Sequence, residues 1–180
     1  MSDIKVIPDS SFIICFLDDI QQPQYLIRIF NYDGFTFIIG RIVKNEISRS
    51  RRYDHIKSIV ENAESFEYYY YGEILRPFLS IEEIEKGEHE VIATAYVMHS
   101  LGFDIIFILD EDDPRKFVEN NFPDLVDKMT GTVGFIEKCH CVFDIFEKDE
   151  SIDILRLIKN SKFRVKAEII EQAIENIRRC

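Results

Sequence analysis

The chain has 180 residues, of which 46% are hydrophobic and 31% are charged, an ordinary composition for one folded domain with a sizeable core. Its longest apolar runs are only as long as a strand, which excludes a membrane-spanning helix. We expect no signal peptide, because the N-terminal sequence carries acids and lacks a long apolar stretch. The net charge of −11 argues against broad, non-specific DNA binding, which depends on basic contacts to phosphate.

The four cysteines do not have the spacing of a disulfide framework. Cys15 lies in an apolar run, Cys180 is at the end of the sequence, and only His140 separates Cys139 from Cys141. We therefore expect no disulfide framework and a reducing compartment, and the sequence predicts a cytoplasmic protein.

Short apolar runs alternate with amphipathic stretches, a pattern typical of a parallel α/β sheet. In chain order, the expected elements are a strand at 4–7, a helix at 10–17, a strand at 35–39, helices at 41–51 and 55–63, a strand at 66–71, a helical turn at 81–85, a helix at 88–101, a strand at 104–109, a helix at 114–120, a strand at 126–129, and helices at 131–139, 152–160 and 165–178. The order predicts an open, mostly parallel sheet with helices on both faces. In such sheets the functional site lies at the carboxyl ends of the strands.

Two acids follow expected strands at that edge of the sheet. Asp9 comes directly after the first strand, and Asp110 comes directly after the strand at 104–109. Each acid alone is explained as a helix cap or a turn former. Two acids at equivalent strand ends favour a shared site.

Two further acids lie on expected helices. Glu46 lies within the helix at 41–51, and Glu88 opens the helix at 88–101. Taken alone, Glu46 is explained as a solvated helix residue, and Glu88, like Glu90, as a favourable charge near the start of a helix. Together with the acids at the strand ends, they form a set of carboxylates suited to Mg²⁺ or Mn²⁺, which prefer oxygen ligands.

Five sequence elements occur in an order found in one nuclease family. They are Asp-Ser-Ser at 9–11, the helical Glu46, Gly-Glu-His-Glu-Val-Ile-Ala-Thr-Ala from Gly87, Leu-Asp-Glu-Asp-Asp at 109–113, and Gly-Thr-Val-Gly-Phe-Ile at 131–136. Over residues 4–139 the chain resembles the PIN-domain family of metal-dependent ribonucleases, and in particular its toxin-type, VapC-like branch. The resemblance implies a three-layer α/β/α sandwich that forms one domain over 1–180, with 150–180 as a C-terminal helical extension.

The resemblance also implies a site and an activity. The implied catalytic and metal-binding acids are Asp9, Glu46, Glu88 and Asp110, with supporting roles for Ser11, Asp112 and Asp113. Glu88 departs from the family's usual aspartate by one methylene, and Glu111 is a further substitute for the fourth acid. The implied reaction is hydrolysis of RNA by water that Mg²⁺ or Mn²⁺ activates. The implied partners are RNA, a small antitoxin-like protein and a second copy of the chain, with no membrane.

Several other features have more than one interpretation. Arg49, Arg51 and Arg52 form a basic patch after Glu46 that either contacts RNA phosphates or is a solvated helix end. The Cys-His-Cys triplet at 139–141 lacks the spacing for a tetrahedral zinc site. The four tyrosines at 68–71 either stack on bases or pack on alternate faces of a strand. We expect His89 and His99 to be packing or surface residues.

Two other functions are compatible with this sequence. The first is a binding or regulatory module that keeps the PIN fold without efficient cleavage, and convergence of the four carboxylates would distinguish the nuclease from it. The second is another α/β enzyme with an acidic pocket, such as a phosphatase or a receiver-like domain. No suitably placed lysine follows Met129, which argues against a receiver-like domain, and the lack of a glycine-rich phosphate loop argues against nucleotide binding.

Overall fold

A computed structural model describes residues 3–65, 74–79 and 86–180 of the chain. Its centre is a four-stranded sheet in the order β2-β1-β3-β4, in which all neighbouring strands are parallel. The strands are β1 (Ile4–Pro8), β2 (Phe35–Phe37), β3 (Ile105–Ile108) and β4 (Met129–Thr130). The predicted α/β class with a mostly parallel sheet is therefore confirmed.

The central strands are apolar because helices cover both faces of the sheet. Val6 pairs with Phe37 on one side and with Ile106 on the other, and Val6, Ile7 and Phe107 are almost completely buried. Alternation of polar and apolar residues is absent from such strands, as expected when neither face meets water. β1 and β3 lie side by side in the middle of the sheet, so the residues that follow them emerge next to each other.

One face of the sheet is covered by helices from both ends of the chain. The first connection contains α1 (Ser10–Ile14), a π-helical segment (Cys15–Asp19) and α2 (Pro23–Phe30), and α9 (Thr132–Cys141) lies beside α1. The rings of Phe12 in α1 and Phe135 in α9 meet edge to face with their centroids 5.5 Å apart. The predicted helix at 10–17 is thus α1 and its π-helical continuation.

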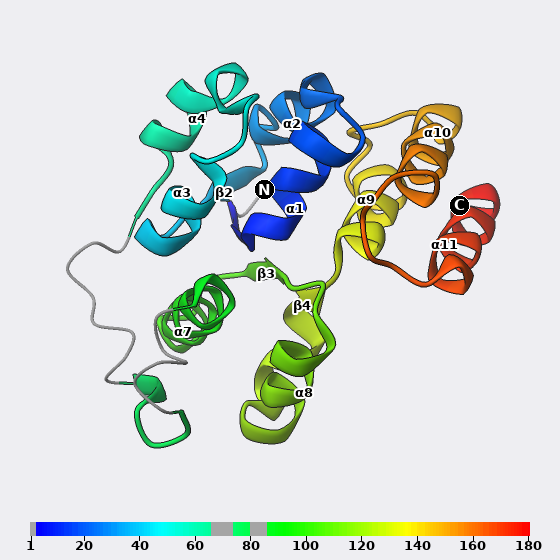
Figure 1. The fold of residues 1–180 in the computed structure, drawn as a ribbon. Helices are drawn as coiled ribbons and strands as arrows, with labels where there is room; N and C mark the ends of the chain where they lie inside the picture. Colours follow the sequence, from blue (N-terminus) through cyan, green and yellow to red (C-terminus); the bar gives the residue numbers. More distant parts are fainter. Residues whose placement is uncertain (1–2, 66–73, 80–85) are drawn as a thin grey trace.

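The connection from β2 to β3 crosses the sheet in the opposite direction, which places it on the other face when both crossovers are right-handed. It contains α3 (Arg41–Ile47), a 3₁₀ segment (Tyr53–His55), α4 (Lys57–Asn62) and α7 (Gly87–Ser100). Helix α7 packs against β1 and β3 and is buried on almost all sides through its first nine residues. Helix α8 (Asp112–Asn121) packs beside α7. Figure 1 shows α7 and α8 on one side of the strands, and α1 and α9 on the other.

Some predicted boundaries were wrong. The strand predicted at 126–129 begins only at Met129, because Pro123–Lys128 forms a 3₁₀ helix. The C-terminal helices are α10 (Lys148–Lys159) and α11 (Ala167–Arg179), so α10 begins four residues before its predicted start. The strand predicted at 66–71 and the turn predicted at 81–85 lie outside the described residues.

The C-terminal helices are tied to the rest of the chain by packing and by a covalent bond. Both α10 and α11 contact α9 and each other. A disulfide joins Cys141, the last residue of α9, to Cys180, while Cys15 and Cys139 are buried free thiols. The cysteine spacing did not predict this single pair, and it no longer argues for a reducing compartment. Among the described helices, none is both long enough and apolar enough to cross a membrane.

Candidate metal centre

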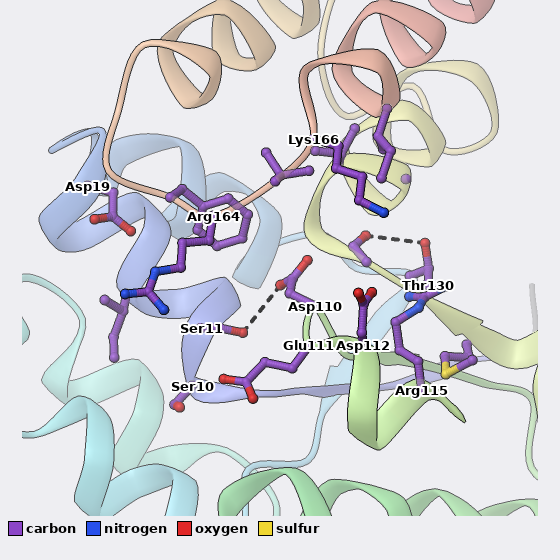
Figure 2. Close-up of a pocket in the computed structure, with 18 of the residues that line it drawn as sticks. Ser10, Ser11, Asp19, Asp110, Glu111, Asp112, Arg115, Thr130, Arg164 and Lys166 are labelled. Atoms are coloured by element: carbon purple, nitrogen blue, oxygen red, sulfur yellow. Dashed lines mark hydrogen bonds between the residues drawn. The ribbon is translucent and has the colours of Figure 1, made fainter. Parts of the chain in front are cut away.

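Asp9 and Asp110 lie next to each other at the carboxyl ends of the two central strands. The Asp9 backbone N–H donates to the Ile108 carbonyl (3.1 Å), which fixes the register of the two strand ends. The Ser11 hydroxyl oxygen lies 2.9 Å from Asp9 Oδ2 and 3.2 Å from Asp110 Oδ2. Because the hydroxyl has one proton, Ser11 donates to only one carboxylate at a time (Figure 2 marks its contact with Asp110). Ser11 and Asp110, which are 99 positions apart in the sequence, are thus in direct contact.

Asp9 has a local structural role as well as this contact. Its Oδ1 accepts a hydrogen bond from the Ser10 backbone N–H (2.6 Å), so Asp9 caps α1. The pKa of Asp9 is raised to about 6, mainly by burial and further by the charges of Glu46 and Glu88. The hydrogen bonds that Asp9 accepts from Ser11 and Ser10 oppose this rise. The helix-cap interpretation and the shared-site interpretation are therefore both compatible with its position.

Asp110 is held by the first residue of α9. The Thr132 backbone N–H donates to Asp110 Oδ1 (2.8 Å), and the Thr132 hydroxyl donates to Asp110 Oδ2 (2.6 Å). Burial raises the pKa of Asp110, while hydrogen bonds from Thr132 and Ser11 and the charge of Arg115 lower it in part. A Cβ at Gly131 would lie 3.1 Å from Asp110 Oδ1, so glycine allows this close approach. Sequence reasoning quoted the segment at 131–136 but missed Thr132; its place after a parallel strand was the available signal.

Glu46 and Glu88 approach Asp9 from α3 and from the start of α7. Both carboxylates are close enough to raise the pKa of Asp9 by charge repulsion. Glu46 lies against the first residue of α7, because a Cβ at Gly87 would come within 2.6 Å of Glu46 Oε2. The fold therefore brings Glu46, Glu88, Asp9 and Asp110 to one end of the sheet.

Glu90 has a different environment from Glu88, two residues earlier on the same helix. It is buried, and Oε2 accepts hydrogen bonds from the backbone N–H groups of Ile42 (2.9 Å) and Val43 (3.0 Å). These are orphan donors in the first turn of α3, so Glu90 supplies the cap that this helix lacks locally. A Cβ at Gly40 would overlap the Glu90 carboxylate, at 2.1 Å from its Cδ. Glu90 thereby fixes α3, and with it Glu46, against α7.

Of the other predicted site residues, some lie beside the four acids and others do not. Asp112 and Asp113 are exposed in the first turn of α8, and both line a cleft that opens beside Asp110. Arg52 forms a hydrogen bond with Gln21 (2.8 Å) and an ion pair with Asp18 (3.7 Å).

Arg49 and Arg51 are exposed after α3, and among the described residues neither they nor Arg52 line this cleft. His89 is buried with its ring 5.8 Å from that of Phe117, which fits the expected packing role. The tyrosines at 68–71 lie outside the described residues.

A cleft of about 1200 Å³ opens beside Asp110 and Ser11. Its acidic side consists of Asp110 and the three residues that follow it, Glu111 to Asp113. Its opposite side is the connection between α10 and α11, which contributes Lys162, Arg164 and Lys166. Figure 2 shows the side chains of Arg164 and Lys166 extending from that connection towards the acids. Sequence reasoning missed this basic segment, because 162–166 is far along the chain from every predicted site residue.

The four carboxylates fit a divalent cation by charge and by chemistry. Within the described part of the chain, no lysine or arginine forms an ion pair with Asp9, Glu46, Glu88 or Asp110. Burial and mutual repulsion raise the pKa of Asp9, and a bound cation would reverse that effect. Carboxylate oxygens are also the ligands that Mg²⁺ and Mn²⁺ prefer.

The side-chain arrangement is nevertheless open. No three of the four carboxylates place ligand atoms within 4.8 Å of one another; among the described residues only His140, Cys141 and Cys180 do so, and the two sulfurs of that group are bonded to each other. Mg²⁺ needs only one or two protein carboxylates because it keeps several waters. Asp9 and Asp110, which both contact Ser11, are therefore the pair that fits an ion.

Comparison of the chain with family models, with curated proteins and with solved structures found no match. The PIN-domain resemblance therefore rests on the residues quoted above and on their order.

Proposed function

We propose that the chain is an endoribonuclease that hydrolyses RNA phosphodiester bonds with the help of Mg²⁺ or Mn²⁺. The observation that carries this proposal is the pair of buried aspartates at adjacent strand ends, joined through Ser11 and not paired with a basic side chain in the described residues. Buried carboxylates are unfavourable unless positive charge compensates them, and Arg115, whose charge acts on Asp110, forms no ion pair with it. The order of the sequence elements, which resembles that of PIN domains, supports the choice of RNA.

The side chains divide between holding the ion and orienting its ligands. Asp9 and Asp110 would hold the cation, and Glu46 and Glu88 would accept hydrogen bonds from water around it. When bound, a divalent cation lowers the pKa of a coordinated water and offsets negative charge on the phosphate. Ser11 and Thr132 donate hydrogen bonds to the Asp110 carboxylate and so fix its orientation. Loss of a hydrogen bond that orients a metal-binding carboxylate commonly changes metal affinity or activity by about 10- to 100-fold.

Cleavage of an end-labelled single-stranded RNA tests the proposal. Wild-type protein is compared with Asp9→Asn and Asp110→Asn, with Mn²⁺, with Mg²⁺ and with EDTA. The control is Asp124→Asn, which removes an exposed carboxylate outside the cleft. We expect metal-dependent cleavage by wild type and by the control, and loss of cleavage in both site variants. Equal cleavage by wild type and both site variants would contradict the assignment.

A binding module without efficient cleavage is the second candidate, and the open arrangement of the carboxylates favours it. No three of them converge within 4.8 Å in the described residues. This function predicts binding of RNA and of Mn²⁺ without product formation in the same assay.

The proposed partners beyond RNA rest on the family resemblance alone. They are a small antitoxin-like protein and a second copy of the chain. A cytoplasmic location belongs to the proposal as well, because that is where an RNA substrate and such a partner would be met.

A further inference from the structure

The connection between α10 and α11 is built to present three cations on one side. Lys162, Arg164 and Lys166 are exposed and alternate with Phe163 and Val165, which are half-buried and pack against the core. All five residues of the segment line the cleft. Phe163 and Val165 hold the segment against the core, and the three charged side chains between and beside them remain exposed at the cleft.

The start of this segment is held in place locally. The Ser161 hydroxyl donates to the Ile158 carbonyl (2.8 Å) at the end of α10 and accepts from the Phe163 backbone N–H (3.0 Å). These bonds cap the C-terminal end of α10 and fix the direction of the residues that follow it. The charges are thus presented by a positioned segment between two helices that pack against α9.

Two of the three cations have no ion-pair partner in the described part of the chain. Lys162 interacts with Asp19, whose pKa is raised by burial and lowered in part by Lys162. Among the described residues, Arg164 and Lys166 form no ion pair and donate no side-chain hydrogen bond. They face Ser11, Asp110 and Thr130 across the cleft (Figure 2). In a chain with a net charge of −11, three cations within five residues form a local concentration of positive charge opposite the acids of the cleft.

A polyanionic strand fits such a cleft better than a single small anion. The cations at Lys162, Arg164 and Lys166 are spread over five residues, so together they can contact more than one phosphate of a strand. Guanidinium groups bind phosphate through two parallel hydrogen bonds, and ammonium groups bind it as point charges. The carboxylates on the opposite side repel phosphate unless a bound cation neutralises their charge. A strand held at the basic side would therefore present its next phosphodiester bond to the cation at Asp110.

We propose that Lys162, Arg164 and Lys166 bind the backbone phosphates of single-stranded RNA next to the bond that is cleaved. This inference rests on the proposed ribonuclease function and names the surface that holds its substrate. Contacts to phosphate carry little sequence information, so the segment contributes affinity and register and leaves base selection to other residues.

The experiment measures binding of a fluorescent single-stranded RNA by anisotropy as a function of salt. Wild type is compared with the double variant Arg164→Gln/Lys166→Gln. The control Lys116→Gln/Lys138→Gln removes two exposed cations outside the cleft, and Arg49→Gln/Arg51→Gln tests the patch after α3. Measurements in Ca²⁺ or on the Asp110→Asn background keep the RNA intact. Circular dichroism and thermal melts establish that each variant is folded.

Loss of two phosphate contacts should lower the slope of log K against log salt by about 1.4, and affinity in 0.1 M salt by roughly 25-fold. Both controls should retain the wild-type slope. An unchanged slope for the Arg164/Lys166 variant, an equal loss in the Lys116/Lys138 control, or a loss only in the Arg49/Arg51 variant would overturn the assignment.

The same variants separate this inference from the proposed function. If wild type cleaves RNA and the Arg164/Lys166 variant cleaves it with unchanged KM, the ribonuclease stands and the basic segment is not its substrate surface. If no cleavage is seen but binding follows the predicted slopes, the segment binds RNA and the nuclease assignment fails.

Discussion

Replacement of Asp9 by asparagine should stabilise the protein when no metal is present. Burial and two neighbouring glutamates raise the pKa of Asp9 from 3.8 to about 6, which corresponds to about 3 kcal/mol of unfavourable interaction of the charged form in the folded state. Asparagine removes the charge and keeps an acceptor for the Ser10 N–H and a polar group facing Ser11. Allowing about 1 kcal/mol for imperfect hydrogen bonds, we expect a net gain of about 1–2 kcal/mol at neutral pH.

The free energy of unfolding of the wild type should change with pH in a definite direction. Because the folded protein holds the Asp9 proton more tightly than the unfolded chain, wild-type stability falls as pH rises from about 4 to about 6. Above this window the whole penalty applies, and below it the two proteins should differ little. The assay is urea unfolding of wild type and Asp9→Asn in EDTA at several pH values from 3.5 to 8. A variant less stable than wild type at pH 7.5 would refute the reasoning.

Three other substitutions test the surroundings of the site. Gly87→Ala adds a Cβ within 2.6 Å of Glu46 Oε2, so the carboxylate must move, and Mn²⁺ affinity measured by titration should fall by about tenfold. Glu90→Ala leaves the half-buried N–H of Ile42 and the buried N–H of Val43 without an acceptor, and urea unfolding should show a loss of about 2–3 kcal/mol; no loss would rule out its capping role. Cys180→Ser opens a disulfide of sequence separation 39, which should lower the free energy of unfolding by up to about 4 kcal/mol. Reduction of the wild type by dithiothreitol should have the same effect, and no difference on reduction would contradict the bond.

The sequence predicted those parts of the fold that depend on local pattern. Strand β3 could be read from its continuous apolar run and β1 from Ile4, Val6 and Ile7, and the positions of Asp9 and Asp110 after them followed directly. The start of β4 was misplaced because its strand is only two residues long and follows a 3₁₀ segment with similar composition. A two-residue strand forms because it pairs with a neighbouring strand, and its own sequence contributes little.

Contacts between distant segments were not predictable in this way. The alternative explanation of Glu90 as a favourable charge at a helix start was reasonable, but its carboxylate instead caps another helix, 48 residues earlier in the sequence. The Cys141–Cys180 pair and the position of Lys162 to Lys166 across from Asp110 depend on how α10 and α11 pack on α9. No local periodicity encodes that packing, so a single sequence contains no signal for it.

The central claim is that Asp9 and Asp110 bind a divalent cation together. The most direct measurement is titration of the metal-free protein with Mn²⁺, in which the electron paramagnetic resonance signal of free Mn²⁺ gives the bound fraction. We expect saturable binding to wild type and to the control Asp124→Asn, with affinity reduced at least tenfold in both Asp9→Asn and Asp110→Asn. Binding of equal affinity in all four proteins, or no saturable binding to the wild type, would contradict it.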